Sequence, residues 1–240
     1  MADILYNNLG VIRFLNSPVP SNAYLVVCEK HKRCFVVDPG TKEQNNIRDY
    51  VQKKGYSLDY IMLTHEHFDH CWGVNSLLDT FNAKVVTTRL CSHWIKTPMN
   101  YFNKLYFNSE KMYSVNKVDV IVEDVDMKLE WNDYIISFIA AKGHTNRGMC
   151  ISVSNALFTG DTMIYKTKPF LKKKYGASIE DLKKTIDFIY EFFDNDIIVY
   201  PGHGEKFQLI EMQEYYKDYF AGKYDDHLRS SSILSEKPIK

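Results

Sequence analysis

Three histidines and two acidic residues lie within six consecutive positions, 65–70, of the segment Thr64-His65-Glu66-His67-Phe68-Asp69-His70. Imidazole nitrogens and carboxylate oxygens bind zinc at about 2.0–2.2 Å. In a straight strand His65 and His67 would share one face, but the alternation breaks before Asp69 and His70, so we expect the chain to turn here. The turn would allow the first two histidines to approach one ion, and Asp69 with His70 to approach a second.

Neither ion would be complete with these ligands alone, because zinc usually takes about four. Three further candidates each follow a β-rich stretch and have a glycine beside them: Gly143-His144-Thr145, Gly160-Asp161-Thr162 and Gly202-His203-Gly204. Glycine lets the backbone turn sharply and lie close to a metal centre. Alone, each would be read as an ordinary surface histidine or turn aspartate, but together they predict a metal site. Of the histidines outside the pattern, His31, His93 and His227, only His93 is expected to be able to reach a substrate.

The elements that must position these residues are mostly short strands. Apolar and β-branched stretches predict strands at 11–15, 23–28, 34–37, 60–63, 84–87, 134–141, 149–154, 156–158 and 197–200. Helices are predicted at 43–54, at 72–81 and after Ser178, which has Asp181 three residues on; 90–113 is an aromatic-rich and also helical segment. Strands mixed with helices in two halves predict an α+β fold of two mixed sheets, packed together and covered by helices on both outer faces.

Bulk properties suit one soluble domain. The chain has 240 residues, 45% of them hydrophobic, and we expect one domain at 1–222 followed by a polar, flexible tail at 223–240. Its formal net charge of zero gives no general attraction for nucleic acid, which is therefore disfavoured as a partner. Neither a leader pattern nor a bilayer-length apolar run is present, so we expect a cytoplasmic protein without membrane contact.

The cysteines support the same expectation. There are five, an odd number, which is not typical of a secreted disulfide framework. Cys28 and Cys34 flank a polar turn and could pair across a hairpin; free thiols are the favoured interpretation. Cys71 is a candidate extra metal ligand, although burial as a small apolar side chain is favoured.

Together the motifs match the five-motif pattern of the metallo-β-lactamase superfamily, and the chain resembles its glyoxalase II-like (hydroxyacylglutathione hydrolase-like) branch over nearly its whole length. The resemblance implies the four-layer αβ/βα sandwich. It further implies that the first metal is held by His65, His67 and His144, the second by Asp69, His70 and His203, and that Asp161 bridges both. Asp38, in Val37-Asp38-Pro39-Gly40, matches the family's early aspartate, which supports the metal ligands from outside.

A hydrolase follows from that resemblance. Two zinc ions per chain are expected, with iron or manganese compatible with the same ligands, and a metal-bridging hydroxide would attack a small ester or thioester. Asp69 is the expected catalytic residue, which orients the nucleophile and assists proton transfer, whereas Glu66 is expected to be structural. The positively charged centre favours a small, anionic substrate.

The sequence restricts the substrate of this predicted hydrolase only in part. True β-lactamases usually lack the bridging aspartate, and the 37 residues after His203 (240 minus 203) leave little room for the C-terminal domain with which glyoxalase II binds glutathione. Arg147, in a His-Thr-Asn-Arg-Gly segment that departs from the branch's usual His-Thr-Pro-Gly-Ser, is a candidate substrate contact, as are Lys166 and Lys168 in a lysine-rich run. The aromatic segment 90–113 could be a lid over the metals or a homodimer contact.

Three alternatives stay open at this point. A mononuclear iron persulfide dioxygenase resembles this branch and uses only the first-site histidines and the aspartate. A phosphodiesterase or nuclease of the same superfamily is disfavoured by the neutral charge. A catalytically inactive binding protein is disfavoured by the complete ligand set.

Overall fold

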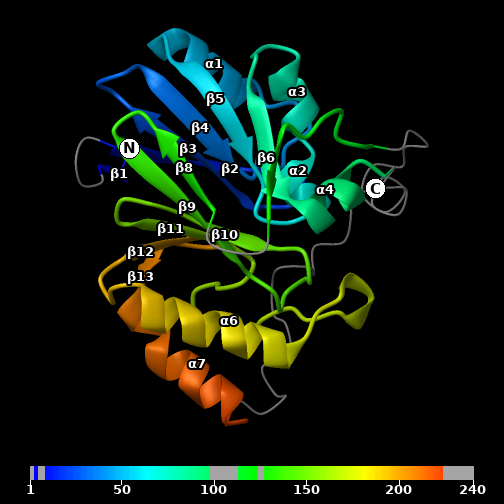
Figure 1. The fold of residues 1–240 in the computed structure, drawn as a ribbon, viewed down its shortest axis with the longest axis vertical. Coiled ribbons are helices and arrows are strands. Elements are labelled where there is room, and N and C mark those ends of the chain that lie inside the picture. The colour runs from blue at the N-terminus through cyan, green and yellow to red at the C-terminus, as the bar shows by residue number, and fades with distance from the viewer. Residues whose placement is uncertain (1–2, 5–8, 98–112, 124–126, 224–240) are drawn as a thin grey trace.

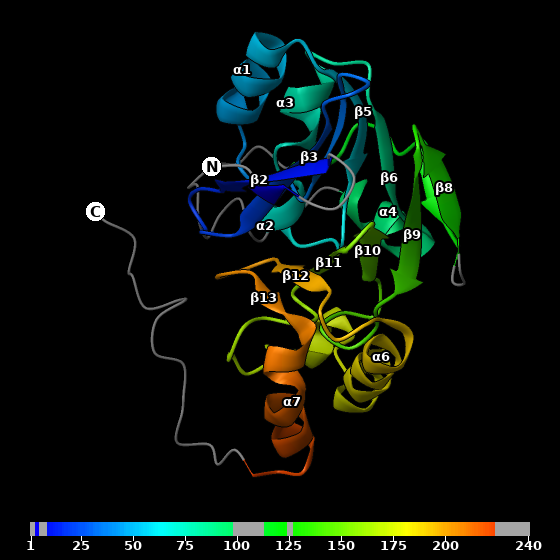
Figure 2. The ribbon, with the colours of Figure 1, turned by 90° about the vertical axis from the view of Figure 1, so that its left-hand side faces the viewer.

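The computed structural model describes residues 3–4, 9–97, 113–123 and 127–223. Two mixed β-sheets face each other, and helices cover both outer faces, which gives the expected four layers (Figure 1). Seen from the side, α1 and α3 lie beyond one sheet, and α6 and α7 lie beyond the other (Figure 2). The prediction of the fold class is therefore confirmed.

The first sheet has seven strands in sequence order, antiparallel from β1 to β4 and parallel from β4 to β7. Its strands are β1 (Asp3–Ile4), β2 (Leu9–Leu15), β3 (Asn22–Cys28), β4 (Arg33–Val37), β5 (Ser57–Met62), β6 (Lys84–Thr88) and β7 (Val120–Val122). The helices on its outer side are α1 (Asn45–Lys54), α2 (Phe68–Cys71), α3 (Val74–Leu78) and α4 (Arg89–Ile95).

The second sheet has six strands in the order β13-β12-β11-β10-β9-β8, in which only β11 and β12 pair in parallel. Its strands are β8 (Lys128–Trp131), β9 (Tyr134–Ala140), β10 (Met149–Val153), β11 (Ala156–Gly160), β12 (Ile198–Pro201) and β13 (Phe207–Gln208). The helices on this side are the 3-10 turns η2 (Lys173–Tyr175) and η3 (Leu209–Met212), with α6 (Ile179–Phe192) and α7 (Gln213–Phe220).

Period-two alternation divides the apolar residues among three cores. In β3 every residue is buried, but Tyr24 and Val26 face the other sheet, whereas Leu25 and Val27 face the helices. The third core lies under α6, where Leu182, Ile186 and Ile189 are buried. Both sheets are thereby fixed from two sides, which holds their strand ends in place.

Several local predictions can be compared with this structure. The Oγ of Ser178 accepts a hydrogen bond from the Asp181 amide at 3.1 Å, so the predicted helix start is confirmed. The helix predicted at 72–81 is present but shorter: it corresponds to α3, Val74–Leu78, and it is preceded by Gly73, whose amide donates a hydrogen bond to the Pro39 carbonyl at 2.7 Å.

The possible Cys28–Cys34 pairing is absent, and the favoured interpretation of free thiols is confirmed. Cys28 lies opposite Arg33, and Cys34 lies opposite Val27, so the two thiols point into different cores on opposite faces of the sheet. All five cysteines, Cys71 among them, are free and buried, and the cytoplasmic location stays a prediction.

The C-terminal tail, apart from Lys223, and residues 98–112 of the predicted lid or dimer contact lie outside the described residues, as does His227. The proposed domain boundary therefore stays a prediction. Among the residues that the structure describes, no helix has the length and apolar character needed to cross a membrane.

Candidate metal centre

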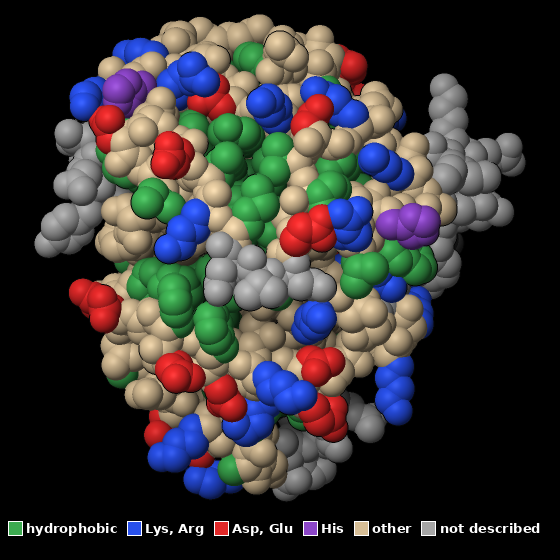
Figure 3. Space-filling model, in the orientation of Figure 1, with side chains coloured by type: hydrophobic (Ala, Val, Ile, Leu, Met, Phe, Trp, Pro, Cys, Tyr) green, Lys and Arg blue, Asp and Glu red, His purple; other side chains and the backbone are tan. Residues whose placement is uncertain are grey.

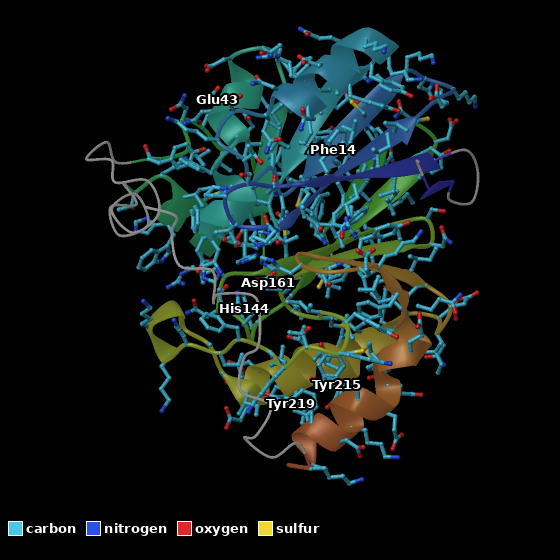
Figure 4. All side chains as sticks on the ribbon, turned by 180° about the vertical axis from the view of Figure 1, so that it is seen from behind. Phe14, Glu43, His144, Asp161, Tyr215 and Tyr219 are labelled. Carbon is cyan, nitrogen blue, oxygen red and sulfur yellow. The ribbon has the colours of Figure 1, made fainter. Side chains whose placement is uncertain are left out.

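The predicted ligands come together where strands of both sheets end. His65 follows β5, and Asp69 and His70 belong to the short helix α2, which starts directly after His67. Asp161 follows β11, and the neighbouring parallel strand β12 leads to His203. His144, from the turn between β9 and β10, lies beside Asp161 (Figure 4).

The first cluster consists of His65, His67 and His144. The Nδ1 atom of His67 lies 3.1 Å from the Nε2 atom of His65 and 3.1 Å from the Nε2 atom of His144. The Oδ2 atom of Asp161 lies 4.0 Å and 3.6 Å from the same Nε2 atoms of His65 and His144. These four side chains offer three nitrogens and one oxygen to a common point.

The second cluster consists of Asp69, His70 and His203. The Oδ2 atom of Asp69 lies 3.6 Å from Nε2 of His70 and 3.4 Å from Nε2 of His203. Asp161 reaches this cluster too, since its carboxylate oxygens lie 3.5 Å from each of these nitrogens. Asp161 is thus the side chain shared by the two clusters.

The outer nitrogen of four histidines is held by a fixed hydrogen-bond partner. Nδ1 of His65 lies 2.9 Å from Oγ1 of Thr64, and Nδ1 of His70 lies 3.0 Å from Oδ2 of Asp38. Nδ1 of His144 and of His203 lie 2.9 Å and 3.1 Å from backbone carbonyls, those of Phe170 and Pro20. Such contacts fix the tautomer and turn each Nε2 inward, as metal-binding histidines require.

Asp38 has the position that the sequence predicts for a supporting residue. Its carboxylate accepts hydrogen bonds from the amide and hydroxyl of Thr64, at 2.7 Å and 2.6 Å, as well as contacting His70. Its φ of +52° is uncommon for a non-glycine residue and is maintained by these contacts. Asp38 and Thr64 thereby connect both clusters from outside.

Two of the flanking glycines are needed because their backbone lies very close to side chains of the metal centre. A Cβ on Gly202 would lie 2.3 Å from Oδ1 of Asp161, and a Cβ on Gly160, whose φ is +49°, would lie 2.3 Å from Oγ1 of Thr64. Any larger residue would displace the groups that surround the clusters.

The two clusters differ in charge. Burial, with repulsion from neighbouring imidazoles, lowers the pKa of His65 well below its usual value and that of His67 to about 3, so both are neutral at pH 7. Burial also disfavours the cationic forms of His70 and His203, but the carboxylates of Asp161 and Asp69 outweigh it and raise their pKa values to about 9 and about 11. In the metal-free chain the second cluster therefore holds protons that a metal ion would replace.

These residues fit metal ions. Nε2 of His70 and Oδ1 of Asp161 are buried and have no hydrogen-bond partner among the residues that the structure describes, although they lie only 3.5 Å apart. Buried polar atoms without a partner are costly, and a cation would satisfy both of these. The nitrogen and oxygen donors, without cysteine, suit zinc and are compatible with iron or manganese.

The other candidate residues have neighbours of their own. Arg147 forms an ion pair with Glu66, at 2.6 Å. The amino group of Lys166 lies 5.1 Å from the centre of the Tyr165 ring, and the positive charge of Lys168 acts to lower the pKa of Tyr219 in α7. Lysine 172 of the same run lies 4.5 Å from the ring of Phe170, whose carbonyl holds His144. His93 is exposed on α4, and His31 contacts Asp133 at 2.8 Å.

Sequence reasoning missed the carbonyls of Phe170 and Pro20, because every residue has a backbone carbonyl and only the fold selects these two. It also missed Thr64, although a hydroxyl directly before the first histidine was an available signal.

This geometry defines a metal-binding αββα protein, and comparison with known proteins identifies its family. The family model for the metallo-beta-lactamase superfamily matches residues 16–203, and the chain belongs to that superfamily. The predicted recognition, and with it the expectation of a metal-dependent hydrolase, is confirmed at this level.

Relatives and solved structures agree with the assignment. A probable polyketide biosynthesis zinc-dependent hydrolase of Bacillus velezensis is 29% identical over 189 residues, which cover 76% of this chain and 73% of that protein. A probable hydroxyacylglutathione hydrolase of Schizosaccharomyces pombe is 26% identical, over 75% of this chain but only 62% of that protein. The crystal structure of the B3 metallo-beta-lactamase BLEG-1 superposes with a TM-score of 0.74 at 21% identity, covering 85% of this chain and 96% of the other, which shows a shared fold.

Proposed function

We propose that this chain is a dinuclear metal-dependent hydrolase of small esters or thioesters. The observation that carries the proposal is the position of Asp161, whose carboxylate lies within 4.0 Å of histidine nitrogens from both clusters. A carboxylate shared in this way suits two metal ions close together rather than one. The proposed ligands are His65, His67 and His144 for one ion, Asp69, His70 and His203 for the other, and Asp161 for both.

Bound there, divalent ions would polarise a carbonyl oxygen and lower the pKa of a water molecule to about 7. The protein's own contribution is to hold the donors in place. Asp38, Thr64 and the carbonyls of Phe170 and Pro20 fix the imidazoles, so little reorganisation is needed when substrate binds.

Asp69 is the proposed proton acceptor. Burial acts to raise the pKa of its carboxyl, but the neighbouring His70 and His203 outweigh this and hold it below the usual value, so Asp69 is ionised at neutral pH. Its side chain is 13% exposed whereas that of His70 is fully buried, so Asp69 lies on the accessible side of the cluster. From there it can orient a water molecule and take its proton.

The substrate class is supported by the rim and by the relatives. Lys172 and the exposed ring of Phe170 form a cationic and apolar edge beside His144, which suits an anion with an apolar part. One relative is named as a hydroxyacylglutathione hydrolase and another as a polyketide biosynthesis hydrolase, and acyl compounds are a reasonable common class. On the face shown in Figure 3, acidic and basic side chains are interspersed, so that face offers no continuous basic surface to a nucleic acid. Substrate contacts by Lys166 and Lys168, and a homodimer, stay predictions.

The test combines metal analysis with turnover. Protein purified without added metal should contain nearly two zinc ions per chain and should hydrolyse an acyl-thioester faster than a phosphodiester. His203→Ala should remove the second ion and most of the activity, while leaving the first cluster able to bind metal. A single iron ion per chain without hydrolysis would contradict the proposal and favour a dioxygenase.

A further inference from the structure

Beside the first cluster lies an ion pair that the proposed chemistry does not use. Glu66 and Arg147 are joined by a 2.6 Å contact between Oε1 and Nη1, and their side chains are only 7% and 10% exposed. The other carboxylate oxygen of Glu66 accepts a hydrogen bond from the hydroxyl of Thr145, at 3.2 Å. Charged side chains are rarely buried to this extent unless they are paired, so this contact is maintained by the fold.

The pair connects the two loops that carry the first cluster. Glu66 lies between His65 and His67, and Arg147 lies three residues after His144. The backbone of the same two loops meets where the Met149 amide donates to the Thr64 carbonyl at 2.8 Å. Glu66 therefore adds side-chain links between two segments whose relative position determines how three imidazoles meet.

Arg147 is itself held from outside. Its guanidinium lies 4.2 Å from the centre of the Trp94 ring, on α4, and its carbonyl accepts a 2.6 Å hydrogen bond from Oγ1 of Thr88, the residue that caps the same helix. With its guanidinium on Glu66 and Trp94, Arg147 is in a position to act through the histidine loops rather than by binding substrate.

We propose that Glu66 and Arg147 are a positioning pair that sets the metal affinity of the first histidine cluster. The pair fixes the distance between the loop of His65 and His67 and the loop of His144. It also neutralises, next to the metal site, a guanidinium cation that would otherwise repel a divalent ion. This inference rests on the proposed metal centre.

The test isolates the first cluster in a His203→Ala background, in which the second cluster lacks a ligand. Cobalt and zinc affinities are measured by competition with a chromophoric chelator, and the visible absorption of bound cobalt reports the ligand geometry. Glu66→Gln should weaken binding by about 10- to 100-fold, the usual effect of removing a partner outside the ligands, and should change the cobalt spectrum. Arg147→Gln, a second variant in case the first fails to fold, should have the same effect. Arg147→Lys, which keeps a cation facing Glu66, should retain most of the metal affinity.

A matched control is available on the strand that leads to this loop. Asp59, in β5, is 7% exposed and pairs with Arg33 at 2.5 Å. Asp59→Asn should lower the melting temperature of the metal-free protein, as Glu66→Gln should, because each removes the charge of a buried carboxylate that is paired with an arginine. It should leave metal affinity and the cobalt spectrum unchanged.

The outcomes separate the two proposals. Unchanged affinity in Glu66→Gln, or an equal loss in Asp59→Asn, would overturn the positioning role and leave the metal centre standing. Failure of the His203→Ala background to bind cobalt at all would overturn the first metal site, and the positioning role with it.

Discussion

Metal ions and protons compete for the same nitrogens of His70 and His203, and this competition gives a quantitative prediction. The pKa values of about 9 and about 11 mean that both side chains are cationic imidazolium groups at pH 6.0. A metal ligand must be deprotonated, so filling the second cluster should release about two protons. His65 and His67 should contribute none, because burial and the neighbouring imidazoles lower the pKa of His65 well below its usual value and that of His67 to about 3.

The sign of the pH dependence follows directly. Protons stabilise the metal-free form below these raised pKa values, so metal affinity should increase as pH rises. With two protons displaced, the dissociation constant of the second cluster should fall by about 100-fold per pH unit between pH 6 and pH 8, where both histidines are still protonated.

Calorimetric titration of zinc into metal-free protein can measure the release. Performed at pH 6.0 in two buffers of different ionisation enthalpy, it yields the number of protons transferred to buffer. A metal-bound water molecule with a pKa of about 7 is mostly un-ionised at this pH, so it adds little to the number of protons released. The variant His203→Ala, which should not bind the second ion, should release about two protons fewer. Release of less than one proton by the unaltered protein, or an affinity that does not change from pH 6 to pH 8, would refute the assigned charges.

Three further substitutions, the last with a control variant, test the catalytic, structural and steric arguments separately. Asp69→Asn, in the zinc-loaded protein, should lower thioester turnover by about 10²- to 10⁴-fold, because it removes the proposed proton acceptor; a loss below tenfold in kcat would contradict that role. Ser178→Ala removes the 3.1 Å cap on the Asp181 amide and should cost about 1 kcal/mol, seen as a melting temperature lower by about 2–4 °C with turnover unchanged. Gly202→Ala places a Cβ 2.3 Å from Oδ1 of Asp161 and should reduce bound metal in elemental analysis, whereas Gly55→Ala, with no atom within 4 Å of its Cβ, should affect stability alone.

Most strands could be predicted because their signal is local. In β3 every residue is buried, and the continuous apolar run from Ala23 to Cys28 that is typical of such a strand is visible in the sequence. Long-range contacts determine the details that the sequence left open. The break between α2 and α3 depends on the bond from Gly73 to Pro39, and the register that separates Cys28 from Cys34 depends on how the hairpin closes. Neither can be read from a short window of sequence.

The same difference between local signals and long-range contacts applies to the metal centre. Residues 65–70 are close together in space because they are consecutive in the sequence, and glycines flank the other three ligand candidates. Residue types and spacing were therefore enough to predict the metal ligands. What orients these donors is mostly not encoded by residue type. The carbonyls of Phe170 and Pro20 are ordinary backbone groups, and only the tertiary fold brings them to His144 and His203.

Glu66 and Arg147 show most clearly why such links need a structure. Their separation of 81 positions hides the pair, and each residue alone suggested something different: Glu66 a structural side chain, Arg147 a substrate contact. The pairing accounts for the burial of both side chains, since a buried carboxylate requires a cation and a buried guanidinium requires an anion. A departure from a family's motif at Arg147 therefore need not change what the enzyme binds. It can instead change how rigidly the neighbouring ligands are held, which is why metal affinity, and not only substrate preference, has to be measured.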